Sequence, residues 1–166
     1  VGLRMSHPLC YSRRMKVKNN MKQEAIKPIF DLDGTLIKED RNSKRLFDFN
    51  NNAAILNLEE GDLTPLGKLV RDSGKQFDIL TARGKLNAPF IREALEGLGF
   101  NIRKIVCVGV DINEPSDWAR VSSARVAQRK QRIVKFIMRK LVDNDQRNLE
   151  GLGELGELVS QDQETF

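Results

Sequence analysis

Two aspartates, Asp31 and Asp33, follow a short apolar run. Asp33 directly precedes Gly34, and glycine is typical of a turn. Because glycine permits a positive φ, both carboxylates can face one site at the carboxyl end of a buried strand, where open α/β sheets bind ligands. Two close carboxylates repel each other unless a cation lies between them, and hard oxygen ligands favour Mg²⁺. The pattern therefore predicts a metal-binding site, whereas the alternative is that both aspartates only cap a turn.

The hexapeptide Asp31-Leu32-Asp33-Gly34-Thr35-Leu36 resembles the first motif of the haloacid dehalogenase superfamily of phosphohydrolases. The resemblance implies that Asp31 is a nucleophile that becomes an aspartyl-phosphate. It also implies that Asp33 is the general acid that protonates the leaving group and the base that then activates water. This agrees with general chemistry, because a carboxylate nucleophile divides phosphate-ester hydrolysis into two displacements.

The second motif of that superfamily is a threonine or serine at the end of the next strand, and Thr81 follows the apolar run Phe77–Leu80. The resemblance implies that Thr81 hydrogen-bonds a phosphoryl oxygen, although a threonine here also suits a helix cap. Arg83 resembles the arginine that follows this motif in polynucleotide kinase phosphatase domains and in small phage and bacterial relatives. It is therefore expected either to contact substrate phosphate or to be an ordinary surface arginine.

The third motif is a lysine that neutralises the nucleophile and the phosphoryl oxygens, and two lysines compete for it. Lys130 lies three, four and seven residues before Ile133, Val134 and Ile137, so it shares their buried helix face. Lys135 falls on another flank and is expected to be solvated. Lys130 is the favoured choice.

The fourth motif is acidic and follows the apolar pair Leu141-Val142. The resemblance implies that Asp143 binds Mg²⁺ directly, together with Asp31 and Asp33, and that Asn144 acts through water. Many relatives have a second aspartate where this chain has Asn144, which lowers the negative charge of the site. Asp145 is a substitute partner, and Asn148 is expected to order the loop.

Short apolar runs alternate with helical patterns from residue 28 onward, which predicts an α/β domain with a mainly parallel sheet. The resemblance specifies a Rossmannoid three-layer α/β/α sandwich with a minimal cap. The expected strands are Pro28–Leu32, Gln76–Thr81, Lys104–Val110 and Lys140–Asp143. The expected helices are Leu63–Ser73, Ala88–Leu98, Val121–Met138 and Gln146–Val159.

Composition separates a basic amino-terminal stretch from the remaining chain. Residues 1–23 hold six basic side chains and no acidic one, and their pattern predicts a disordered basic tail, with a nucleic-acid-binding arm or a targeting peptide as the alternatives. Residues 24–166 are expected to form one domain. The 166-residue chain has 40% hydrophobic and 31% charged residues and lacks a long apolar run, which excludes a membrane protein. With two cysteines, a reduced cytoplasmic setting is expected.

The segment 37–62 has room only for a hairpin flap or a very small cap. An open site suits large substrates such as nucleic-acid ends or phosphoproteins, or a small molecule enclosed by a neighbouring subunit. Residues 119–140 offer a basic face for a polyanion, comprising Arg120, Arg125, Arg129, Lys130, Arg132, Lys135, Arg139 and Lys140. The prediction is a Mg²⁺-dependent phosphomonoesterase for nucleotides or nucleic-acid ends; the alternative is a catalytically weak nucleic-acid-binding or regulatory protein with the same fold.

Overall fold

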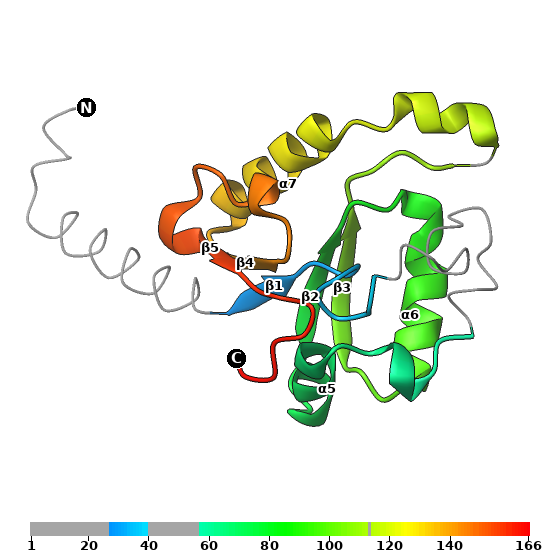
Figure 1. The fold of residues 1–166 in the computed structure, drawn as a ribbon, viewed down its shortest axis with the longest axis vertical. Coiled ribbons are helices and arrows are strands. Elements are labelled where there is room, and N and C mark those ends of the chain that lie inside the picture. Colours follow the sequence, from blue (N-terminus) through cyan, green and yellow to red (C-terminus); the bar gives the residue numbers. More distant parts are fainter. Residues whose placement is uncertain (1–26, 40–56, 113) are drawn as a thin grey trace, which may run out of the picture.

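The computed structural model describes residues 27–39, 57–112 and 114–166, and their strands form one parallel sheet (Figure 1). The order across the sheet is β3-β2-β1-β4-β5, so β1 lies in the middle. The strands are β1 (Pro28–Phe30), β2 (Phe77–Thr81), β3 (Ile102–Cys107), β4 (Lys140–Asp143) and β5 (Gly156–Leu158). The expected α/β class with a mainly parallel sheet is confirmed, and the arrangement is compatible with a Rossmann-like fold.

Three α-helices match expected segments: α5 (Pro65–Asp72), α6 (Ala88–Gly97) and α7 (Ser123–Ile137). Local sequence explains where two of them begin. The Thr64 hydroxyl accepts a hydrogen bond from the Gly67 amide at 2.9 Å, and Pro65 occupies the first turn of α5. The Ser122 hydroxyl caps α7 by accepting from the Arg125 amide at 3.3 Å.

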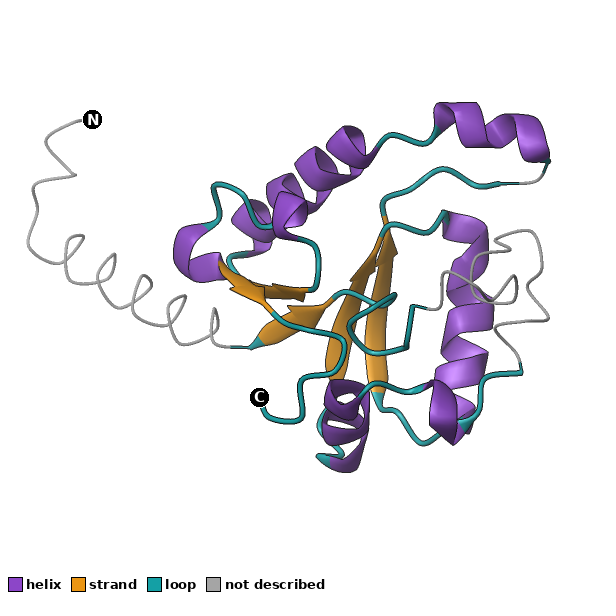
Figure 2. Ribbon diagram, viewed as in Figure 1, coloured by secondary structure: helices purple, strands orange, loops and turns teal. Residues whose placement is uncertain are grey.

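The helices pack on both faces of the sheet (Figures 1 and 2). Neighbouring residues of one strand point to opposite faces, and the two cores follow that alternation. The core with α5 and α6 contains Phe30, Ile79, Val142, Leu66, Ile91 and Leu95. The core with α7 contains Ile29, Leu80, Leu141 and Val134. Strands apolar on both faces are what a parallel sheet covered on both sides requires.

The prediction of a fourth helix over Gln146–Val159 is wrong. The segment forms two short 3-10 turns, Gln146–Asn148 and Gly153–Leu155, and then β5, which pairs with β4. Gly151 and Gly153 have φ of 74° and 54°, a left-handed conformation that ends a right-handed helix. The three-residue spacing of the leucines in this segment is the period of a 3-10 turn rather than of an α-helix.

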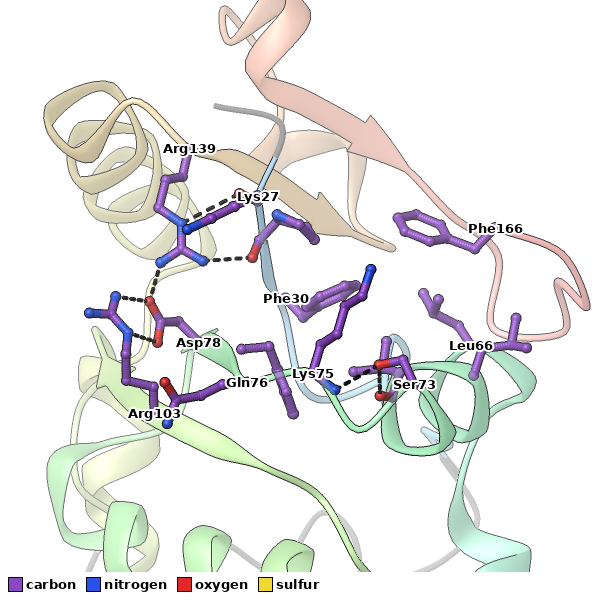
Figure 3. A pocket seen from close by; sticks show the side chains of 14 residues that line it. Lys27, Phe30, Leu66, Ser73, Lys75, Gln76, Asp78, Arg103, Arg139 and Phe166 are labelled. Atoms are coloured by element: carbon purple, nitrogen blue, oxygen red, sulfur yellow. Dashed lines mark hydrogen bonds and ion pairs between the residues drawn. The ribbon is translucent and has the colours of Figure 1, made fainter. Parts of the chain in front are cut away.

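A charge cluster ties together the starts of the strands, at the edge opposite the aspartate motif (Figure 3). Asp78 is 2% exposed and accepts hydrogen bonds from the guanidinium groups of Arg103 and Arg139. Burial by itself raises the pKa of the Asp78 carboxyl, but the two guanidinium groups outweigh burial and lower it. A cavity of about 1000 Å³ opens beside this cluster, lined by apolar side chains such as Phe30 and Phe77.

Some expectations concern residues outside the described part of the chain. The basic tail 1–23 lies there entirely, and of the flap segment 37–62 the structure describes only residues 37–39 and 57–62. The boundaries of the domain therefore stay predictions. In the described ranges, no helix has the length and apolar character needed to cross a bilayer.

Candidate active site

The carboxyl ends of β1, β2 and β4 bring together the polar residues that the motifs predict. Asp31 directly follows β1, whereas Thr81 and Asp143 are the last residues of β2 and β4. The Asp31 amide donates to the Val142 carbonyl at 2.9 Å, which holds the two aspartate-bearing strand ends side by side. Parallel pairing thus places residues 112 positions apart in the chain at one edge of the sheet.

The chain turns sharply after Asp31 because of Gly34. Its φ is 81°, and the Leu36 amide closes the turn by donating to the Leu32 carbonyl at 2.9 Å. A Cβ atom on Gly34 would lie 2.3 Å from Nδ2 of Asn144, so a side chain would displace that amide. The turn predicted at Asp33-Gly34 therefore forms and lets the β1 and β4 loops approach closely.

Lys130 lies between two carboxylates at the centre of the site. Its Nζ donates to Oδ1 of Asp31 at 2.7 Å and to Oδ2 of Asp143 at 2.8 Å. Lys130 is 1% exposed, whereas Lys135 on the same helix is exposed to solvent. The structure therefore brings Lys130, the favoured lysine, into the site and leaves Lys135 outside it.

The pKa values of Lys130 and Asp31 depend on two facts: the side chains are buried, and a single ammonium group faces the two carboxylates of Asp31 and Asp143. Burial and the nearby Asp143 raise the pKa of Asp31 to about 7, against the opposing effect of the Lys130 ammonium. Burial by itself lowers the pKa of Lys130, but the two carboxylates outweigh it and raise that pKa. The lysine therefore favours its charged form, and it can balance only one of the two carboxylates when both are ionised.

Thr35, which was given no role, and Asn148, which was expected to order the loop, complete the surroundings of the carboxylates. The Thr35 hydroxyl donates to Oδ2 of Asp31 at 3.0 Å. Nδ2 of Asn148 donates to Oδ2 of Asp143 at 2.9 Å, so Asn148 contacts the acid itself in addition to its place in the loop. Thr35 lies four residues after Asp31 and Asn148 five after Asp143, so short spacing within each motif was the available signal.

Arg83 holds Asp33 in a two-pronged ion pair. Nη2 of Arg83 donates to Oδ1 of Asp33 at 2.7 Å, and Nε donates to Oδ2 at 2.8 Å. Burial by itself lowers the pKa of Arg83, but Asp33 outweighs it and the pKa is raised. Arg83 was expected to contact substrate phosphate or to lie on the surface; the structure buries it at 2% exposure and places it against Asp33.

Thr81 is buried at the end of β2, where its hydroxyl oxygen accepts a hydrogen bond from the Arg83 amide at 3.2 Å. It thus shapes the turn that carries Arg83. Asp145, considered as a substitute acidic partner, forms an ion pair with Arg147 at 2.7 Å, and its amide donates to Oδ1 of Asp143 at 2.9 Å.

A cavity of about 180 Å³ opens over these groups. The predicted residues that line it are Asp31, Asp33, Arg83, Lys130, Asp143 and Asn144. Glu39, Ala82, Asp145 and Asn148 complete the described lining, which does not include Thr81. Because ligand pockets generally measure at least about 300 Å³, this space suits one end of a ligand whose remainder extends outward.

The oxygen atoms around Asn144 suit a small hard cation. One end of its side-chain amide lies 3.0 Å from Oδ2 of Asp31 and 3.1 Å from the main-chain oxygen of Asp33. With its NH₂ group at that end, the amide donates to both oxygens. With its oxygen there, that oxygen lies 3.0 Å and 3.1 Å from the other two, spacings that neighbouring ligands of an octahedral Mg²⁺ ion also have.

The Asp33 carboxylate does not face the site where it was predicted to bind Mg²⁺ together with Asp31 and Asp143. Among the described residues, no cluster of three or more His, Cys, Asp or Glu side chains is placed to hold a metal. The reason is that the Asp33 carboxylate faces Arg83, so Asp33 offers its main-chain oxygen instead. The donors that fit Mg²⁺ are therefore carboxylate, carbonyl and amide oxygens from Asp31, Asp33 and Asn144, next to Asp143.

Comparison of the chain with protein-family models, with curated proteins and with solved structures found no match.

Proposed function

We propose that this chain is a Mg²⁺-dependent phosphomonoester hydrolase that acts through an aspartyl-phosphate intermediate. The observation that carries the proposal is the buried Lys130 ammonium bridging Asp31 and Asp143, with the Asp33 carboxylate held by Arg83 at the rim of the same small cavity. A carboxylate nucleophile, a fixed cation and a second, partly exposed carboxyl group are the parts that this chemistry needs.

In the first step, an oxygen of Asp31 forms a bond to phosphorus while the bond from phosphorus to the leaving oxygen breaks. This step requires Asp33 in its protonated form, which replaces the two-pronged ion pair with Arg83; the carboxyl then donates its proton to that oxygen, so the leaving group departs as an alcohol. The Lys130 ammonium stabilises the negative charge on the phosphoryl oxygens and keeps Asp31 in position.

In the second step, a water oxygen forms a bond to phosphorus and the bond to Asp31 breaks, which releases inorganic phosphate. Asp33 takes the proton from this water and returns to its starting form. The side chain of Asp33 is 25% exposed, so both the leaving group and water can reach it. Arg83 holds the carboxyl group and thereby sets where the proton is given and taken.

Mg²⁺, when bound, would neutralise phosphoryl charge next to Asp31. Asp31, the Asp33 main-chain oxygen, Asp143 and Asn144 are the groups that would hold it. Because Lys130 can balance only one of the two carboxylates when both are ionised, a cation here lowers the cost of ionising Asp31.

The proposal includes the haloacid dehalogenase-type three-layer fold with a small cap within residues 37–62. Its substrates are phosphomonoesters such as nucleotides or nucleic-acid ends. The small cavity supports this, because it admits a phosphoryl group while the leaving group remains outside.

The test is a phosphate-release assay with nucleotides, 3′- and 5′-phosphorylated oligonucleotides and sugar phosphates in Mg²⁺. Loss of the nucleophile in Asp31→Asn should lower kcat by about 10⁴-fold or more. Asp72→Asn, which changes an exposed aspartate at the end of α5, is the matched control and should retain activity. Equal release by Asp31→Asn and the unaltered protein would refute the proposal and favour the nucleic-acid-binding alternative.

A further inference from the structure

A second pocket of about 360 Å³ adjoins the catalytic cavity. The two share a wall, to which Glu39, Ala82, Arg83, Asp145 and Asn148 contribute. The loop after β3 and the start of α7 form the other walls of the second pocket. The second pocket is therefore the space next to a phosphoryl group that lies over Asp31.

The second pocket contains arginines that the catalytic cavity does not use: Arg120, Arg125 and Arg129. Arg125 and Arg129 are four residues apart on α7 and so share one helix face. Arg129 donates to the Val108 carbonyl at 2.8 Å, a neutral partner, and Arg120 pairs with Asp117 at 3.3 Å. Among the described residues, no carboxylate lies within ion-pair distance of Arg125 or Arg129, so their two positive charges are available to an anion.

Apolar side chains also line the second pocket, namely Val110, Ile112, Val121 and Val126. An occupant must therefore present an anion to the arginines and a less polar body to the valines and isoleucine. Arginine binds phosphate oxygens with two parallel hydrogen bonds, which suits a phosphate better than a single carboxylate oxygen. Lys130, which contacts Asp31, lies on the same helix as Arg125, about 7.5 Å further along its axis.

We propose that the second pocket binds a second phosphate on the leaving group, so that the preferred substrates are bisphosphorylated. This inference rests on the proposed function, because it takes the phosphate over Asp31 to be the one that is hydrolysed. The body between the two phosphates, a ribose with its base or another sugar, lies along the apolar side chains of the second pocket.

The experiment compares kcat/KM for matched substrates in Mg²⁺. A nucleoside 3′,5′-bisphosphate is set against its 3′- and 5′-monophosphates, and fructose 1,6-bisphosphate against its two monophosphates. We expect kcat/KM for a bisphosphate to exceed that for both of its monophosphates by about tenfold or more in at least one series. The series that shows this difference identifies whether the second phosphate belongs to a nucleotide or to a sugar. Arg125→Ala should reduce this ratio towards one, and Arg125→Lys should retain part of it.

Arg132→Ala is the matched control, because Arg132 is an exposed arginine on α7 that does not line the second pocket. It should leave the ratio unchanged. Equal kcat/KM values within both series, or a ratio that survives Arg125→Ala, would overturn the inference while leaving the hydrolase proposal intact.

A binding measurement keeps the inference testable if no substrate is turned over, an outcome that counts against the proposed function alone. Calorimetric titration of Asp31→Asn with the same ligands should show tighter binding of a bisphosphate than of its monophosphates. Adding Arg125→Ala should remove the difference. Identical binding of bisphosphates and monophosphates would overturn the inference regardless of activity.

Discussion

Replacing Lys130 by methionine tests the centre of the site, because methionine keeps an unbranched side chain of nearly the same length and removes the ammonium group with its charge and its hydrogen bonds. In the folded protein the ammonium lies 2.7 Å from Oδ1 of Asp31 and 2.8 Å from Oδ2 of Asp143. Both acids and the lysine are at most 5% exposed. The variant therefore leaves two facing carboxylates buried without a cation.

The cost can be worked from these contacts. Breaking a buried, hydrogen-bonded ion pair by removing one partner costs about 3 to 5 kcal/mol, and here one cation serves two anions. For a chain of this size, about 1 kcal/mol lowers Tm by roughly 3 °C, so Lys130→Met should melt about 10 °C lower. Loss of charge stabilisation in the transition state should lower kcat by at least about 10²-fold.

Thermal melting and phosphate release are measured on three variants. Lys135→Met is the matched control, because it removes an exposed lysine from the same helix and should change Tm by less than about 2 °C. The double variant Lys130→Met with Asp143→Asn removes one of the facing charges and should recover part of the lost stability without recovering activity. If Lys130→Met melts within about 2 °C of the unaltered protein, or if Lys135→Met loses as much, the reasoning is refuted.

Two further predictions concern the opposite edge of the sheet and the metal. Asp78→Asn should lower the free energy of unfolding by about 2 kcal/mol at pH 7, since it breaks the ion pairs of a buried carboxylate with the exposed Arg103 and the less exposed Arg139. Because the folded-state pKa of Asp78 is lowered, this stabilisation is present above the carboxyl's ordinary pKa and is lost as pH falls through the folded-state value. Urea unfolding of both proteins from pH 7 to pH 2 should show the gap closing in acid, and a constant gap would contradict the assignment. Chelation of Mg²⁺ should abolish phosphate release, as should Asp143→Ala, and full activity in chelator would refute the metal assignment.

Local spacing in the sequence was sufficient to predict the parts of the site that depend on a single element. Gly34 marks the turn after β1, and the spacing of Lys130 from Val134 predicts a lysine on the buried face of α7. The parallel sheet follows from apolar runs alternating with helical patterns. Each of these signals lies within one short stretch of chain.

The remaining features depend on contacts between distant residues, for which the sequence has no local signal. Arg83 lies 50 residues from Asp33, and nothing near either residue indicates their ion pair. The helix predicted over Gln146–Val159 is wrong because leucines at three-residue spacing fit 3-10 turns better than an α-helix. Pairing with β4 and two glycines at positive φ instead favour turns followed by β5.

The two ends of the sheet differ in how their buried carboxylates are balanced by positive charge, and this difference supports the proposal that the aspartate motif is the reactive site. Asp78 and Asp31 are 2% and 5% exposed, so burial acts on both. At Asp78, two guanidinium groups bind one carboxylate and lower its pKa, as expected for ion pairs that stabilise the fold. At Asp31 one ammonium serves two carboxylates and the pKa is raised to about 7. A buried acid left short of positive charge destabilises the protein unless it takes up a proton or a cation binds, and such an acid at the edge of a cavity supports the proposed chemistry more than a purely structural role.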